Sequence, residues 1–226
     1  MNRIWAGSMS ATASRETSHW GTQSESRTPQ ARVFRFSANA CESMSESPTQ
    51  RQGRRILTLH EMRDLVGLLR SVFSRIAEIR RDNRLARHIQ FPKIPSILSE
   101  SLVVHLLRSG DILPDLSGYS FSLGGKRADI LAERPGETKT IEVKATGKSA
   151  FQNFVAKDVD ANYIIWIHFG DYFAGAGKKT LRAFVLREPK RYFSGRVYVN
   201  LKDLPRKVPD LVEVPVAVER LEHGAL

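Results

Sequence analysis

Cysteine is almost absent from this chain of 226 residues: Cys41 stands alone, so an intrachain disulfide is excluded and nothing indicates a zinc site. The six histidines are scattered, and no two of them have a helical metal-binding spacing such as HxxxH. No run of about 18 apolar residues is present, which argues against a transmembrane helix. The first residues also lack the apolar segment of a secretory signal. These absences predict a cytoplasmic protein with no membrane partner.

Positive charge is what the chain has in excess. It carries 35 Lys and Arg residues against 24 Asp and Glu residues, a formal net charge of +11. A surplus of this size favours a polyanionic partner, either a nucleic acid or an anionic surface, and does not choose between them. The length suits one sizeable domain with an appendage, and the 41% of hydrophobic residues permits a real core.

Residues 1–53 are rich in Ser, Thr, Gln, Arg and Glu and show no apolar periodicity, a composition typical of disorder. The segment could instead be a flexible basic arm that contacts phosphates. It could also be an extension that lies upstream of a true start at Met44. We assign it no function.

Residues 54–94 form a predicted helical region. Between 56 and 82, apolar residues such as Leu59, Met62, Val66 and Phe73 recur at three- and four-residue steps, which predicts one long amphipathic helix. Its opposite face is rich in arginine. That face is either simply solvated, or it contacts a DNA backbone or a second copy of the chain.

A second helix is predicted over residues 96–108 and is apolar enough to be buried. Glu100 lies in the middle of it, and a carboxylate on a buried helix needs a partner. The partner is either a metal site elsewhere in the chain or a nearby arginine, unless Glu100 faces solvent.

The residues that follow predict strands alternating with short helical segments. Gly and Pro mark the turns, and the apolar run 163–169 is typical of a central strand buried on both faces. The predicted strands are 116–123, 127–133, 138–145, 163–169, 181–186 and 196–201, with a short helix over 150–157. We therefore expect an α/β core over 95–204 and a C-terminal tail over 205–226.

The most informative stretch is a predicted hairpin with its turn at Arg134–Glu137. Its second strand alternates Ile141 and Val143 with Glu142 and Lys144, so Glu142 and Lys144 share one face about 6–7 Å apart. If the hairpin is antiparallel, Asp129 on the first strand comes alongside Glu142. Two carboxylates and an ammonium would then occupy one small volume.

Paired carboxylates repel each other, and a divalent cation relieves that repulsion. Mg²⁺ prefers oxygen ligands, which Asp129, Glu142 and the Val143 carbonyl could supply. Lys144 would then help to activate water and offset charge on an attacked phosphate. This pattern favours metal-assisted hydrolysis of a phosphodiester. The alternative is a surface hairpin whose charged groups are only solvated.

The order of these elements resembles that of the PD-(D/E)XK nuclease superfamily, the restriction-endonuclease-like fold. The resemblance covers roughly residues 95–170: a helix with Glu100, strands carrying Asp129 and then Glu142-Val143-Lys144, a helical segment and a buried strand. It departs from the motif at Ala128, where the family name implies proline.

The resemblance implies a central mixed β-sheet flanked by helices and a Mg²⁺-dependent nuclease site. Asp129 and Glu142 would be the metal ligands and Lys144 the catalytic lysine. Glu100 would be the acid that some members supply from the preceding helix, and Gln152 a polar residue on the following helix.

We therefore expect a Mg²⁺-dependent DNA endonuclease of the restriction type. It would act on duplex DNA as a homodimer, and whether it has a companion DNA methyltransferase stays open. Three alternatives remain: a DNA repair or junction-resolving nuclease, a non-catalytic nucleic-acid-binding protein on the same fold, and an unrelated basic α/β protein.

Overall fold

The computed structural model describes residues 54–174 and 180–217, so the segment 1–53 lies outside the described residues. The α-helices are α1 (Leu59–Asp82), α2 (Ser96–Arg108), α3 (Ala156–Val159) and α4 (Leu204–Lys207). The strands are β1 (Ser120–Leu123), β2 (Ile130–Arg134), β3 (Glu137–Thr146), β4 (Phe151–Phe154), β5 (Tyr163–His168), β6 (Thr180–Arg187), β7 (Val197–Asn200) and β8 (Val212–Ala217). Short 3₁₀ turns connect several of these elements.

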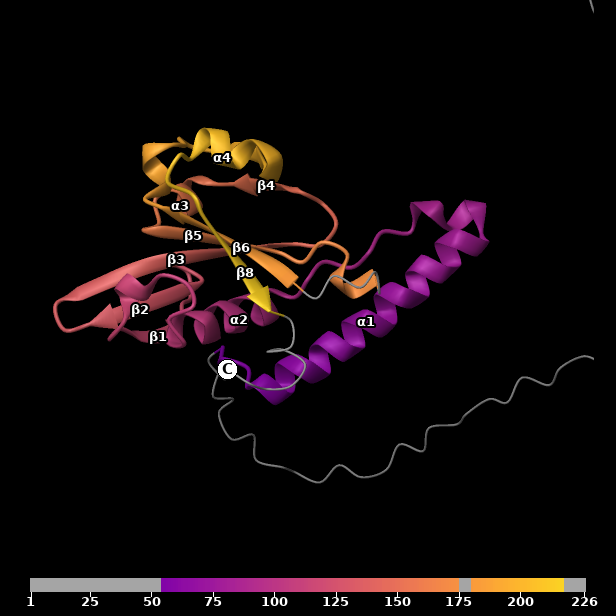
Figure 1. The fold of residues 1–226 in the computed structure, drawn as a ribbon, viewed down its shortest axis with the longest axis horizontal. Coiled ribbons are helices and arrows are strands. Elements are labelled where there is room, and N and C mark those ends of the chain that lie inside the picture. Colours follow the sequence, from indigo (N-terminus) through magenta and orange to yellow (C-terminus); the bar gives the residue numbers. More distant parts are fainter. Residues whose placement is uncertain (1–53, 175–179, 218–226) are drawn as a thin grey trace, which may run out of the picture. The chain divides into compact units, whose positions relative to one another are not determined.

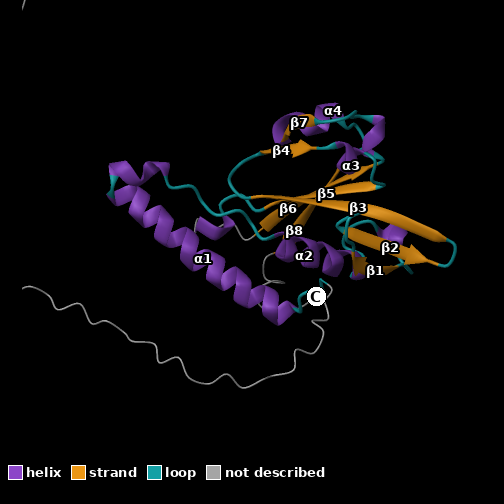
Figure 2. Cartoon of the chain, turned by 180° about the vertical axis from the view of Figure 1, so that it is seen from behind, coloured by secondary structure: helices purple, strands orange, loops and turns teal. Residues whose placement is uncertain are grey.

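Six strands form one mixed sheet in the order β1-β2-β3-β5-β6-β8. β3 and β5 run parallel, and the other neighbouring strands run antiparallel. Helix α2 lies on one side of this sheet, while β4 and α4 lie on the other (Figure 1; Figure 2 gives the view from behind). The expected α/β class with a central mixed sheet and flanking helices is confirmed.

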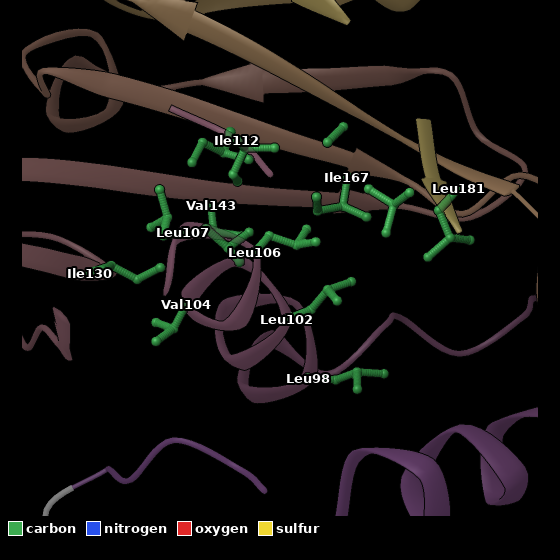
Figure 3. Packing of buried hydrophobic residues seen from close by; sticks show 14 of the residues in the cluster. Leu98, Leu102, Val104, Leu106, Leu107, Ile112, Ile130, Val143, Ile167 and Leu181 are labelled. Carbon is green, nitrogen blue, oxygen red and sulfur yellow. The ribbon is translucent and has the colours of Figure 1, made fainter. Parts of the chain in front are cut away.

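Helix α2 begins and ends where the sequence predicts, and it is buried along almost its whole length. Leu98, Leu102 and Leu106 follow one another at four-residue steps, which places them along one face of the helix. Figure 3 shows Leu106 and Leu107 on the side of α2 that faces the sheet, close to Val143. The helix thus supports β3 from one side.

Helix α1 starts at Leu59 because Thr58 caps it: Thr58 Oγ1 accepts a hydrogen bond from the Glu61 backbone N–H, and the Glu61 carboxylate accepts one from the Thr58 backbone N–H. Its buried residues, Met62, Val66, Leu69 and Phe73, fall at three- and four-residue steps and join the core cluster that contains α2. The predicted amphipathic helix is therefore present, with three fewer residues at its start.

The other face of the sheet is covered by a small second layer. β4 pairs antiparallel with β7 in a two-stranded sheet, and a second core cluster forms around Phe154, Trp166 and Leu204. The predicted helix over 150–157 is wrong, because residues 151–154 form β4 and only 156–159 are helical. Phe154 is buried in the core while Phe151 is exposed, so the segment does not present one apolar helical face.

The two edge strands of the main sheet also differ from prediction. The first strand begins at Ser120 rather than at 116, because Pro114–Leu116 form a 3₁₀ turn. Residues 212–217, expected to belong to a tail, form β8 at the edge of the main sheet against β6. Pro215 is tolerated there because an edge strand has backbone groups that need no ladder partner.

Candidate active site

The β2–β3 hairpin sets the geometry of the predicted site. Its turn contains Gly136 with a φ of 81°, a left-handed conformation that suits glycine. Ile130 faces Ile141 in the antiparallel ladder. One step further along the same register, Asp129 comes opposite Glu142. The side-by-side placement expected for these two acids is therefore the register that the hairpin adopts.

Asp129 is held by a close approach of the chain just before it. Its backbone oxygen accepts a hydrogen bond of 2.8 Å from the Gly124 N–H. A Cβ atom at Gly124 would lie only 2.2 Å from the carbonyl oxygen of Ala128, which no real Cβ atom could do. Glycine is therefore required at position 124 for Asp129 to reach its place beside β3.

Beyond Ile141, where the paired part of β2 ends, no strand of the described residues pairs with this side of β3, which we call the free edge of β3. Along this edge, side chains form hydrogen bonds with some of the backbone groups of β3. Asp129 Oδ2 accepts a hydrogen bond of 2.8 Å from the Val143 N–H, and Gln152 Nε2 donates one of 3.0 Å to the Ala145 oxygen. The N–H and C=O of one strand residue point to the same edge, so the Val143 carbonyl also faces this side.

Glu142 is almost completely buried, with only 1% of its surface exposed. Burial raises the pKa of its carboxyl to about 7, and the negative charge of Asp129 adds to the rise. Its Oε1 lies 3.0 Å from Lys157 Nζ but receives no well-directed hydrogen bond from the described residues. Glu142 is thus a buried carboxylate whose charge is only partly compensated.

Lys157, on α3, supplies that partial compensation. Its Nζ lies 3.0 Å from Glu142 Oε1 and 4.0 Å from Asp129 Oδ1, so one ammonium lies near both acids. Burial lowers the pKa of Lys157, but the nearby carboxylates of Glu142, Asp129 and Asp158 together outweigh burial, and the net shift is upward. The Lys157 ammonium therefore lies near the position where a bound metal ion would relieve the repulsion between Asp129 and Glu142.

Lys144 has a separate partner. Its Nζ lies 2.8 Å from Oδ1 of Asp158, which is 1% exposed, and Asp158 Oδ2 accepts a hydrogen bond of 2.9 Å from the Val155 N–H. Asp158 therefore fixes the position of the lysine that the sequence singles out. Asp158 was missed from sequence because an acid on a short polar segment gives no signal of its own.

Glu100 and Gln152 are placed differently from the expectation. The Glu100 carboxylate pairs with Arg54, with a distance of 2.5 Å from Oε2 to Nη2. Of the partners considered for Glu100 from the sequence, the described residues thus supply an arginine. Gln152 lies on strand β4, not on a helix, and its described hydrogen bond is the one to the Ala145 oxygen at the free edge of β3.

The donor set around Asp129 fits Mg²⁺ better than a transition metal. Two carboxylates and a backbone carbonyl are hard oxygen donors, and Mg²⁺ is usually held by one or two carboxylates with several waters. The buried, incompletely bonded Oε1 of Glu142 is the observation that supports this fit. Among the described residues, no cluster of three or more His, Cys, Asp or Glu side chains is arranged to hold a metal.

Comparison with known proteins adds no relative: no family model, no curated protein and no solved structure matches the chain. In the part of the chain that the structure describes, no helix is both long and apolar enough to cross a bilayer.

The pKa of Glu142 leads to a first prediction, for the protein without divalent ions. Between the unperturbed value of 4.5 and about 7, the folded state keeps a proton on Glu142 that the unfolded state has released. Stability falls with pH wherever the folded state binds more protons, so this carboxyl should cost the fold up to roughly 3 kcal/mol as pH rises through that interval.

Urea unfolding in EDTA across this pH range measures the effect. The difference between wild type and Glu142→Gln isolates it, because the other acids are common to both proteins. Wild type should lose stability relative to the variant as pH rises, and parallel pH profiles for the two proteins would contradict the assigned pKa.

Proposed function

We propose that this protein is a Mg²⁺-dependent DNA endonuclease with a restriction-endonuclease-like core. The observation that carries the proposal is the hairpin register, which sets Asp129 opposite Glu142 while Lys144 shares the face of Glu142. The order α2, β1, β2, β3, α3 and β5 agrees with the one on which the resemblance rests, except that strand β4 is inserted between β3 and the short helix α3. The net charge of +11 supports a nucleic acid as the partner.

In this proposal Asp129, Glu142 and the Val143 carbonyl hold the ion. When bound, Mg²⁺ supplies positive charge to the phosphodiester and makes a coordinated water more acidic. Lys144 places its ammonium where negative charge develops on the attacked phosphate. Asp158 acts through Lys144, because its ion pair at 2.8 Å limits the positions that the ammonium can take.

We further propose that the protein is a restriction-type enzyme that cuts duplex DNA as a homodimer, since each strand must meet a site. The basic face of α1 supports contact with a DNA backbone. Arg84 and Arg87, just beyond this helix, have no carboxylate partner among the described residues and can bind phosphates.

A second candidate is a non-catalytic nucleic-acid-binding protein on the same fold. One observation favours it: the charged groups of the site compensate one another, Lys157 with Glu142 and Lys144 with Asp158. A cluster that is neutralised from within can be retained for structure alone. The two candidates differ in whether a divalent cation binds at Asp129 and Glu142.

Incubation with supercoiled plasmid tests the proposal, in Mg²⁺ and in EDTA, beside the variant Lys144→Gln. Glutamine is chosen because its amide can still donate a hydrogen bond to the buried Asp158. We expect Mg²⁺-dependent cleavage by the wild type that is lost in EDTA and in the variant. DNA binding without cleavage by the wild type would favour the second candidate, and equal cleavage by both proteins would exclude this site.

A further inference from the structure

A pocket of about 830 Å³ opens where β3 and β5, the one parallel pair among the described strands, come to their carboxyl ends. Its walls include residues 145–149 at and just beyond the end of β3, Gly170 and Asp171 after β5, and Gln152 from β4. Part of α1 and the segment 91–94 complete it. Ligands of open α/β sheets commonly bind beyond the carboxyl ends of the strands, and the volume suits a small organic ligand.

One part of the pocket lining is aromatic. The ring of Phe91 stacks on that of Phe73, with 4.9 Å between centroids and 14° between ring planes. The guanidinium carbon of Arg80 lies 5.2 Å from the Phe91 ring centroid. Aromatic rings and guanidinium planes are the groups on which proteins stack unpaired nucleobases.

Cations line the same pocket. Arg80 and Lys93 have no carboxylate partner in the residues that the structure describes, and Lys148 Nζ lies 3.7 Å from Asp171 Oδ1. Unpaired ammonium and guanidinium groups favour an anionic ligand, and phosphate is one that both bind well. A planar apolar group joined to a phosphate satisfies both parts of the lining.

The pocket continues the free edge of β3 that begins at the candidate active site. Gln152 belongs to both, because it bonds the Ala145 oxygen and also lines the pocket. Its own Oε1 accepts no hydrogen bond within the described segments, which leaves an acceptor for the edge of a base. Along the strand, Glu142 and Ala145 are about 10 Å apart.

We propose that this pocket binds one unstacked nucleotide of the substrate strand, next to the phosphate that is cut. The base lies against Phe91 and Arg80, and Lys93 and Lys148 bind its phosphate. This inference rests on the proposed nuclease function and adds a site at which the enzyme holds a nucleotide out of the base stack.

Binding in EDTA tests the proposal without cleavage. The probes are 5′-dAMP, deoxyadenosine, inorganic phosphate and a 5′-phosphorylated oligo(dA) of about five nucleotides, followed by protein-observed NMR or calorimetry. The variants are Lys93→Gln and Phe91→Leu, and the matched control is Lys190→Gln, an exposed lysine that does not line this pocket. Leucine keeps apolar volume beside Phe73 and removes only the ring.

We expect 5′-dAMP to bind at least about tenfold more tightly than deoxyadenosine or phosphate, and the oligonucleotide to bind more tightly still. Both pocket variants should weaken oligonucleotide binding about tenfold, and Lys190→Gln should not. Equal binding of phosphate and 5′-dAMP, or no effect of Phe91→Leu, would overturn the base site. Equal binding of 5′-dAMP and the oligonucleotide would overturn the assignment to a strand.

The outcome is separable from that of the proposed function. Nucleotide binding that follows this pattern in a protein that cuts no plasmid would leave the pocket in place and remove the nuclease. Cleavage that depends on Mg²⁺ and Lys144, without nucleotide binding in this pocket, would support the nuclease and overturn the nucleotide site.

Discussion

Asp129→Asn is expected to abolish Mg²⁺-dependent cleavage and to leave the fold intact. Asparagine has the same shape, and its side-chain oxygen can still accept the hydrogen bond that Asp129 Oδ2 takes from the Val143 N–H. What is lost is one of the two negative charges that would hold the ion. We expect the cleavage rate to fall by about 10²–10³-fold or more, as when a single electrostatic contact of a transition state is removed.

Two measurements separate this effect from damage to the structure. Calorimetric titration with Mg²⁺ should show affinity reduced at least about tenfold in Asp129→Asn, whereas Lys144→Gln should bind the ion normally and still fail to cut. Glu133→Gln is the matched control, because Glu133 is an exposed acid on the same hairpin, within β2. Wild-type affinity and rate in Asp129→Asn would remove Asp129 from the site.

Lys157→Met is expected to tighten Mg²⁺ binding. In the wild type the Lys157 ammonium lies 3.0 Å from Glu142 Oε1 and 4.0 Å from Asp129 Oδ1, so an ion entering between the acids has to displace it. Methionine keeps much of the apolar chain and has no charge to displace. We expect affinity to rise about tenfold, which corresponds to ~1.4 kcal/mol.

The same variant should be less stable than the wild type when no divalent ion is present. Removing one partner of a fully buried ion pair costs about 3–5 kcal/mol, but the Lys157 side chain is 40% exposed, and solvent reduces the loss. We expect about 1–2 kcal/mol in EDTA. Saturating Mg²⁺ should recover it, so thermal melting with and without the ion measures both effects.

Lys190→Met serves as the control, since Lys190 is an exposed lysine whose nearest carboxylate, that of Asp160, lies 3.6 Å away and outside the site. Weaker Mg²⁺ binding in Lys157→Met would mean that Lys157 assists the ion instead of competing with it. The proposed competition between Lys157 and the ion would then be wrong.

The local parts of the fold were predictable from sequence. Alternation of Ile141 and Val143 with charged residues indicated β3, and the turn before Glu137 indicated the hairpin, so the facing positions of Asp129 and Glu142 followed from the register. These features are determined by residues that lie close together in the sequence. The apolar repeat of α1 and the continuous burial of α2 are of the same kind.

The parts that failed depend on partners far away in sequence. Phe151–Phe154 becomes a strand because β7 pairs with it from more than forty residues along the chain, and β8 becomes one because β6 offers an edge. The partners of Lys144 and Glu142 could not be identified either. Asp158 and Lys157 reach them only once α3 packs over β3, and Arg54 reaches Glu100 only after α1 and α2 are in place.

The close approach at Gly124 has a consequence for how this chain can vary. A residue with no side chain to take part in chemistry decides whether Asp129 reaches β3, since even the methyl group of alanine would overlap the Ala128 carbonyl. Evolutionary constraint on the site therefore extends to a position that a search for charged or polar residues would pass over. Among relatives of this protein that keep Asp129 in place, glycine at position 124 should be as invariant as the acids themselves.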